Sequence, residues 1–329
     1  MKSIYINVGM GLGGNISLTY VTKELHEVYD EVAVCSPYWD VFKCDPYVDL
    51  VYRPEEMKDF VMDAKSKNAY IMNQRLYDMS EFIYKKISYS DAWRKLCGLK
   101  LKNDKDGSTG EHTLNVIESF PEIKIQVNNI LNLVKQNGFE NFIIIQTQGG
   151  QSPLVRVPSE IGKDGKPTGK PDWSKVPYNK EQEPLQRHLP ENVTQGFIDL
   201  MAKEHPKTAI LLYSLPNENK LDGSNLIKMT VPYLTYYELA KLNKCLGAVT
   251  IDSSLQHLIS GVTKVITIWG HTEPVSFGHV GNKNIIQSCR RDDILYFTAL
   301  GPSGAKISYI KPEEMLKEVD DYIYSTESK

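Results

Sequence analysis

The sequence predicts an α/β protein with two doubly wound domains, and three observations support this. Ser3–Val8 is an apolar, β-rich run that leads into the glycine-rich turn Gly9–Gly14 and a helix-like stretch. This order is typical of the start of a doubly wound domain. Asn141–Ile145 is a second buried strand, and it follows a long amphipathic helix that stops at Gly138. Val249–Gly278 then reads as strand, polar turn, helix, strand and polar loop.

The glycine-rich turn resembles a dinucleotide-binding fingerprint only in part. Gly9, Gly11 and Gly14 fit the spacing GxGxxG. The fingerprint also needs an acidic residue at the end of the next strand, about 20 positions later. That strand, Val32–Cys35, runs into Ser36 and a proline instead. The pattern therefore disfavours NAD binding and favours a close backbone approach to a ligand or to the other domain.

The segment from residue 58 to 107 carries few recognisable motifs. We expect a strand at Asn68–Met72 and short helices at Ser80–Ile87 and Ser90–Leu96. The segment is locally basic, through Lys85, Lys86, Arg94, Lys95, Lys100, Lys102 and Lys105. Such a cluster is either a solvated helix face or a surface for an anionic acceptor. A helix at Pro121–Asn137 closes the first domain, which we place at residues 1–138.

The second domain is expected at residues 139–311. It contains an insertion at about residues 153–184, whose stretch Gly162–Lys166 is typical of a hairpin tip. The further elements that we expect are the helix Asn192–Glu204, the strand Thr208–Tyr213, the helix Thr235–Lys244 and, after the domain, a terminal helix Pro312–Tyr324 within residues 312–329.

Composition excludes several classes of protein. The 329 residues are 41% hydrophobic, which suffices for substantial cores, and the formal net charge is −3. This charge gives no general case for a nucleic-acid or membrane partner. The start of the chain lacks signal-peptide features, and no apolar run approaches the roughly 20 residues of a membrane span. The cysteines are odd in number and form no CxxC pair, so we expect reduced thiols in a cytoplasmic protein: Cys35, Cys44, Cys97, Cys245 and Cys289.

The turn after the strand Ala248–Ile251 is the best candidate for a binding site. Asp252, Ser253 and Ser254 follow this strand at once and start the next helix. A second buried strand, Val265–Trp269, leads into another polar loop. A helix N-terminus with small hydroxyls suits a phosphate, and both polar segments stand at strand ends, where parallel sheets bind ligands. The simpler alternative is a helix cap and an ordinary turn.

The same stretch resembles the C-terminal signature of glycosyltransferase family nine, the ADP-heptose:lipopolysaccharide heptosyltransferases. The matching residues are Asp252-Ser253-Ser254, His257-Leu258 and Gly270-His271-Thr272-Glu273-Pro274. In this sequence His271 stands where the family has proline, and Glu273 where it has aspartate. Weaker resemblances lie at Gly14–Thr19, Asp45–Tyr52 and Arg187–Glu191, whereas residues 55–107 and the insertion show none.

The resemblance implies a GT-B glycosyltransferase, with two Rossmann-like domains facing across a cleft and a last helix that crosses back to the first domain. It implies a nucleotide-sugar donor as co-substrate, no metal and no other cofactor. The expected donor-phosphate residues are Asp252, Ser253, Ser254 and His257, with Arg187 in place of the family's lysine. The expected nucleoside residues are Glu218 and Tyr233. The cleft loops are expected to contain Gly13, Gly14, Gly270, His271 and Thr272.

The position of the general base departs from the family's pattern. The family uses an aspartate after the first strand, and Asn15 occupies that position here. A carboxamide cannot accept a proton at neutral pH. The base then lies elsewhere, with Glu111 and His112 as the nearest candidates, or Asn15 only orients the acceptor, or the protein binds nucleotide sugars without catalysis. The acceptor is a saccharide or, alternatively, a hydroxymethylated DNA base.

Overall fold

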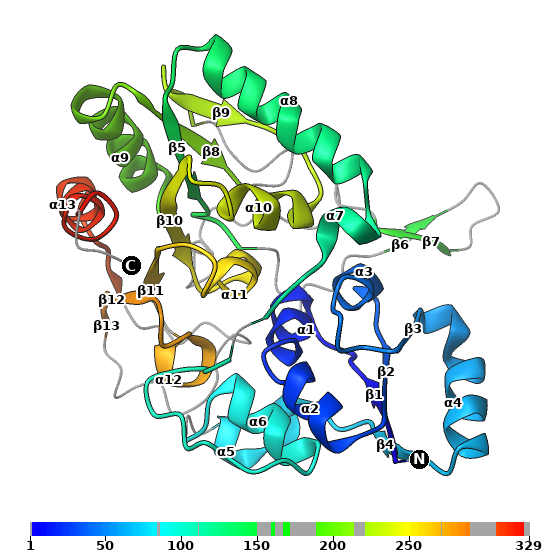
Figure 1. Ribbon diagram of the computed structural model, residues 1–329. Helices are drawn as coiled ribbons and strands as arrows, with labels where there is room; N and C mark the ends of the chain where they lie inside the picture. The colour runs from blue at the N-terminus through cyan, green and yellow to red at the C-terminus, as the bar shows by residue number, and fades with distance from the viewer. Residues whose placement is uncertain are drawn as a thin grey trace.

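The computed structural model describes residues 2–83, 86–110, 112–149, 159–161, 167–171, 189–213, 221–270, 272–289 and 307–325. Its elements form two lobes, each built around one parallel sheet (Figure 1). This confirms the predicted α/β class with two doubly wound halves.

The first lobe contains a four-stranded parallel sheet. Its strands, in spatial order, are β3 (Leu50–Tyr52), β2 (Glu31–Cys35), β1 (Ser3–Asn7) and β4 (Tyr70–Met72). The central strand β1 is buried on both faces, as its continuous apolar sequence predicts.

Short helices make up the rest of this lobe. They are α1 (Leu12–Leu18), α2 (Thr22–Val28), α3 (Trp39–Lys43), α4 (Met57–Ser66), α5 (Ser80–Ile83) and α6 (Tyr89–Leu96), with 3₁₀ turns at Pro54–Glu56 and Leu76–Asp78. Of these helices, α2, α3 and α4 contact the sheet directly. The sequence predicts one helix after the glycine turn, but the structure divides it into α1 and α2. The Thr19 hydroxyl bonds to the Ile16 carbonyl in the last turn of α1, which is a local competitor to helix continuation.

The second lobe contains a six-stranded parallel sheet. In spatial order its strands are β12 (Lys283–Ile286), β11 (Val265–Trp269), β10 (Cys245–Ile251), β5 (Asn141–Ile145), β8 (Thr208–Leu212) and β9 (Leu226–Lys228). The two outer strands, β12 and β9, are not anticipated from the sequence. Both are short and only partly buried, so neither has the apolar run that marks β5 and β11.

The remaining helices are α7 (Val116–Ser119), α8 (Glu122–Gln136), α9 (Glu191–Glu204), α10 (Tyr233–Ala240), α11 (Ser254–Ile259), α12 (Pro274–Phe277) and α13 (Pro312–Tyr322). The long helix α8 packs against α10, so it covers the second sheet (Figure 1). We therefore propose to place the domain boundary before α8 rather than at residue 138.

The terminal helix α13 packs against α9 of the second lobe. Its apolar residues Met315 and Val319, with Ile323 just beyond its end, join the hydrophobic core beneath that sheet. The resemblance implies that this helix crosses back to the first domain, and the described residues correct that expectation. The reason is that the apolar stripe of α13 already has a matching surface on α9, and Ile323 reaches Gly247 of β10.

Part of the insertion forms an antiparallel pair, β6 (Ser159–Ile161) and β7 (Pro167–Pro171). The expected hairpin tip, residues 162–166, lies outside the described residues. A second antiparallel pair, β13 (Ser288–Cys289) and β14 (Ile307–Ser308), precedes α13.

The two lobes meet through α1 and α11, which lie against each other (Figure 1). The Tyr20 hydroxyl donates to the His257 carbonyl at 2.7 Å across this junction. Beside it, Ser108 of the first lobe exchanges backbone hydrogen bonds with Gly278 and Val280 of the second. One cluster of buried apolar residues continues from the first core into the second, so the junction is packed rather than hinged on a single linker.

Candidate functional site

Polar residues follow four neighbouring strands of the second sheet at their carboxyl ends. We call this set the strand-end row: Gln146 after β5, Tyr213 after β8, Asp252–Ser254 after β10, and Gly270 with Thr272 after β11. Because the strands are parallel, the row shares one edge of the sheet. The chain passes from β5 outward to β8 and β9, then returns to β10 on the other side of β5. The switch point therefore lies between β10 and β5, where open α/β sheets bind their ligands.

Hydrogen bonds connect the row across the switch point. Gln146 Nε2 donates to Ser253 Oγ at 3.0 Å, and the hydroxyls of Tyr213 and Ser254 are 3.4 Å apart. Ser253 is the N-cap residue of α11, but its side chain makes no capping bond. Both serines are partly exposed, whereas Asp252 is buried within the turn. The two serine hydroxyls and the first N–H groups of α11 thus stand together at the switch point.

The first lobe covers this point closely. A Cβ added to Gly13 would lie 2.9 Å from His257 Cδ2 and 3.7 Å from Ser254 Cα, so the backbone of α1 touches α11 directly. The His257 ring is buried, and it also packs edge-on against Tyr89. The structure therefore brings Gly13, Ser254 and His257 together, and it places the His257 ring in the lobe junction.

Asn15 has a different environment from the one expected. It is fully buried, and its amide group donates to the carbonyls of Met10 and Gly11 at 2.8 and 3.0 Å. Its Oδ1 accepts from Ser36 Oγ at 2.5 Å. Both N–H groups are used within the first lobe, so Asn15 fastens the glycine-rich turn to the end of β2. A role in which Asn15 faces an acceptor in an open cleft is not compatible with this burial.

His112 is also buried, in the lobe junction. Its Nδ1 lies 3.0 Å from Thr19 Oγ1, and its ring packs against Tyr20 and Tyr237. Burial lowers the pKa of His112 to about 3, and the nearby His279 contributes to this shift. An imidazole with so low a pKa is a weak proton acceptor at neutral pH. The geometry favours a packing role.

The remaining predicted residues divide into those that the structure describes and those that it does not. Tyr233 begins α10, and its pKa is raised by burial and by the nearby Asp40 carboxylate of α3. Gly14 is buried against Met10, and Gly270 and Thr272 lie in the strand-end row. The predicted residues that fall outside the described part of the chain are Glu111, Arg187, Glu218 and His271. Leu189, two positions after Arg187, donates its N–H to the Thr147 carbonyl at the end of β5.

Sequence reasoning assigned no role to Gln146 or to Tyr213. Both directly follow buried strands, and that position was a usable signal, because each parallel strand delivers its next residue to the same edge.

Three residues of the basic segment, Arg94, Lys95 and Lys102, form ion pairs. Arg94 is fully buried and pairs with Glu24, Asp91 and Asp104 at 2.8–3.0 Å. Lys102 also pairs with Glu24 at 2.7 Å. These pairs hold the loop after α6 against α2, so the segment offers less unpaired positive charge than its sequence indicates. This weakens the case for a DNA acceptor.

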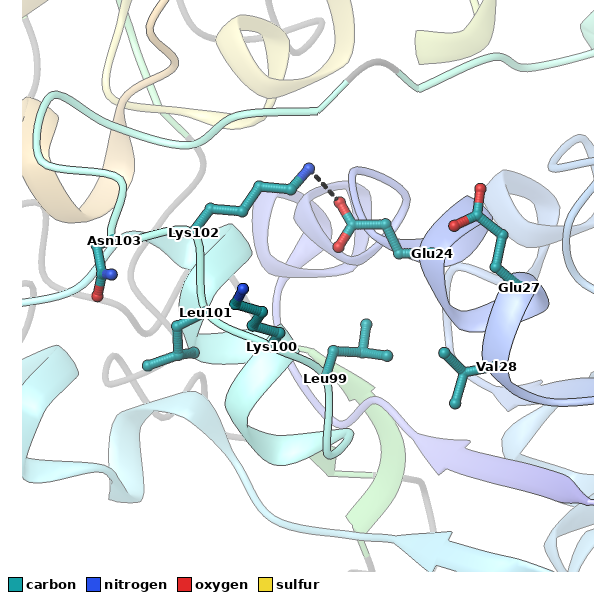
Figure 2. Close-up of a pocket in the computed structure, with 8 residues that line it drawn as sticks. All are labelled: Glu24, Glu27, Val28, Leu99, Lys100, Leu101, Lys102 and Asn103. Carbon is teal, nitrogen blue, oxygen red and sulfur yellow. Dashed lines mark hydrogen bonds and ion pairs between the residues drawn. The ribbon is translucent and has the colours of Figure 1, made fainter.

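A shallow depression of about 660 Å³ lies over the same loop, on the first lobe and apart from the strand-end row (Figure 2). It is lined by Glu24, Glu27, Val28, Leu99, Lys100, Leu101, Lys102 and Asn103. Figure 2 shows the Lys102–Glu24 pair bridging one side of it. We assign no ligand to this depression.

Metal ligands, membrane helices and thiols can be assessed over the described part of the chain. It contains no group of three or more His, Cys, Asp or Glu side chains that could hold a metal ion. Within the same residues, no helix combines the length and apolar character needed to cross a membrane. Cys35, Cys44, Cys97 and Cys245 are free of disulfide bonds and are buried.

Comparisons with known proteins bear on the fold. No protein-family model and no curated protein matches the sequence. Among solved structures, a glycosyl transferase of family 9 from Veillonella parvula matches with a TM-score of 0.63, at 12% identity over 98% of this chain and 97% of the other. The ADP-heptose LPS heptosyltransferase II of E. coli matches with a TM-score of 0.57, also at 12% identity, over 100% of both chains. The E. coli heptosyltransferase WaaC, solved with ADP, gives 0.53 at 12% identity over 97% of this chain and 99% of the other.

These matches extend over nearly the full length of each protein and include both lobes. The resemblance read from the strand-end motifs is therefore confirmed at the level of structure: the chain has the GT-B fold of the family-nine heptosyltransferases.

Proposed function

We propose that this protein is a glycosyltransferase that moves a sugar from a nucleotide-diphosphate donor to a hydroxyl acceptor, by inversion and without a metal. The observation that carries the proposal is the strand-end row at the switch point of a chain that follows the GT-B fold over its whole length. WaaC, a protein of the same fold, has been solved with ADP and with an ADP-heptose analogue. We accordingly take ADP-sugars as the first donors to test.

The donor diphosphate is proposed to bind at Ser253 and Ser254. Their hydroxyls and the first N–H groups of α11 supply hydrogen-bond donors to the phosphate oxygens as charge develops on the leaving group. Asp252 shapes the turn from beneath, and His257 supports α11 at the lobe junction. Arg187 is proposed as the cation on the same phosphates, because Leu189 is bonded to the end of β5.

The nucleoside is proposed to extend toward β8, β9 and α10, with Glu218 on the ribose hydroxyls and Tyr233 near the base. Gly13 of α1 and Gly270 and Thr272 of the loop after β11 then border the transferred sugar. The saccharide acceptor approaches from the carboxyl end of β1, where Gly9 and Gly11 are exposed and have open space around them.

The base that removes the acceptor's proton is proposed to be neither Asn15 nor His112. The Asn15 amide already donates to the Met10 and Gly11 carbonyls of its own turn, and burial lowers the pKa of His112 to about 3. Glu111 remains the candidate from the sequence. Replacing Glu111 by Gln is expected to reduce turnover by 10²- to 10⁴-fold with little change in donor affinity.

Because the hydrogen bonds of Asn15 are all made within the first lobe, the position of the family's base carries no catalytic group here. This favours a second candidate function, a protein that binds nucleotide sugars without transferring them. The two functions separate in one experiment. A thermal-shift screen against ADP, UDP, GDP and CDP sugars identifies the nucleotide, since a ligand at 100 times its Kd stabilises the fold by about 2.7 kcal/mol. Release of free nucleoside diphosphate from that donor supports the transferase, binding without release supports the second candidate, and absence of any shift contradicts both.

A further inference from the structure

Two buried oxygen atoms of the strand-end row have no hydrogen-bond partner among the described residues. They are Gln146 Oε1 and Thr272 Oγ1, and their residues are 2% and 3% exposed. A buried acceptor without a partner destabilises the fold, so such atoms call for a physical explanation. Two of them just beyond the carboxyl ends of β5 and β11, the strands that flank β10, point to a ligand that completes their hydrogen bonds.

The chemistry of Gln146 narrows the kind of ligand. Its Nε2 donates to Ser253 Oγ, which leaves the Ser253 hydroxyl hydrogen available for a phosphate oxygen. The remaining Gln146 Oε1 is an amide oxygen, and it can only accept. The ligand must therefore present a donor such as a hydroxyl beside its phosphate, as the ribose or the sugar of a nucleotide sugar does.

The order of the strands along the sheet edge indicates which part of the ligand Gln146 Oε1 and Thr272 Oγ1 each contact. Along the edge the groups run Thr272 after β11, Ser253 after β10 and Gln146 after β5. Neighbouring strands are about 4.8 Å apart, so the two oxygens flank the serine from opposite sides. A nucleotide sugar has the same order of parts, with a sugar, a diphosphate and a ribose in one line. The ribose end lies toward β8 and β9 in the proposed function, on which this inference rests.

We propose that Thr272 and Gln146 are specificity-determining residues that read hydroxyl groups on the two sides of the diphosphate. Thr272 bonds a hydroxyl of the transferred sugar, and Gln146 Oε1 accepts from a ribose hydroxyl. The protein thereby distinguishes a nucleotide sugar from a bare nucleotide through Thr272, and a ribonucleotide from its deoxy form through Gln146.

The test uses the full chain and measures affinities by isothermal titration calorimetry. The probes are ADP, ADP-heptose and the 2′- and 3′-deoxy forms of ADP, or the same set for whichever nucleotide the thermal-shift screen selects. Thr272→Val keeps the shape of the side chain and removes only a hydroxyl that has no partner among the described residues, so it should fold normally. It should weaken the nucleotide sugar about tenfold, the value of one neutral hydrogen bond, and leave the bare nucleotide within about twofold.

Gln146→Met should weaken the nucleotide and the nucleotide sugar by the same factor, and it should abolish discrimination against one deoxy form. Ser276→Ala is the matched control, because Ser276 Oγ is also buried without a partner among the described residues but lies in α12, outside the strand-end row. It should change neither affinity.

Equal effects of Thr272→Val on both ligands, or no effect on either, would overturn the inference while leaving the proposed function intact. A Ser276→Ala variant that behaves like Thr272→Val would also overturn it. A wild-type protein that binds no nucleotide sugar contradicts the proposed function itself, and this inference with it.

Discussion

Replacing Asn15 by Asp tests whether this residue stands in for a missing catalytic base or only fastens the glycine-rich turn. In the first case a new carboxylate restores the base, and transfer accelerates by about 10²-fold or more. The structure predicts the opposite result. The substituted oxygen would face the Met10 and Gly11 carbonyls, which now accept from the amide at 2.8 and 3.0 Å.

The size of the effect follows from these contacts. A protonated carboxyl group at position 15 can donate only one of the two lost hydrogen bonds, which costs about 1 kcal/mol. Ionising it beside two carbonyls in a fully buried position is worse, so its pKa rises in the folded protein. Holding it protonated costs about 1.4 kcal/mol for each pH unit above the ordinary pKa of about 3.9. We expect Asn15→Asp to lose about 5 kcal/mol of unfolding free energy at pH 7.

Proton linkage determines how the unfolding free energy of Asn15→Asp changes with pH. A carboxyl group whose pKa is raised by folding binds more protons in the folded than in the unfolded state, so its contribution to stability falls as pH rises from about 4. The deficit of Asn15→Asp relative to the wild type should therefore grow by about 3 kcal/mol between pH 5 and pH 7.

Urea denaturation at both pH values measures this deficit, and a transfer assay accompanies it. Asn128→Asp is the control, since Asn128 is exposed on α8 and its substitution should stay within about 0.5 kcal/mol. An Asn15→Asp variant that is as stable as the wild type at pH 7 and transfers sugar faster would refute the argument.

Three further predictions concern the site and the lobe junction. Ser253→Ala should weaken donor binding by about 10- to 100-fold. It should lower the free energy of unfolding by only about 1 kcal/mol, because its hydroxyl does not cap α11 but accepts one hydrogen bond from Gln146 Nε2. Calorimetry and urea denaturation measure the two effects, and lost stability with unchanged affinity would contradict this. Gly110→Ala should cost about 3 kcal/mol of unfolding free energy, measured by urea denaturation, because φ is +132° and the new Cβ would lie 2.3 Å from the Tyr20 carbonyl oxygen. Gly138→Ala is the control: its φ is +81° but the space around it is open, so it should cost only about 1 kcal/mol. Equal losses in the two variants would exclude a steric clash between residue 110 and Tyr20. The pKa of His112 is about 3 in the folded protein and 6.5 in the unfolded chain, so the unfolded chain binds more protons and wild-type stability should fall as pH drops below 6.5. His112→Gln should make this decline less steep. Parallel plots of unfolding free energy against pH for the two proteins would refute the lowered pKa of His112.

The sequence alone determined the parts of the molecule that depend on local pattern. The strands β5 and β11 coincide with the predicted apolar runs, because a strand buried on both faces needs an uninterrupted run of apolar residues. The positions of Ser253 and Thr272 at one sheet edge also followed from the sequence, since parallel strands deliver their carboxyl ends to the same side.

Tertiary structure decided the features that depend on contacts between distant segments. The sequence shows Asn15 at the end of the first turn, but only its contact with Ser36, just after the next strand, reveals that its oxygen is committed. From the sequence, Arg94 likewise belongs to a basic surface, but in the structure it is buried and forms ion pairs with Glu24 and Asp104. The place of α13 on α9 has the same origin. In each case the decisive contact is made with a segment distant in the sequence. Local sequence therefore cannot predict it, because the two segments meet only when the chain folds.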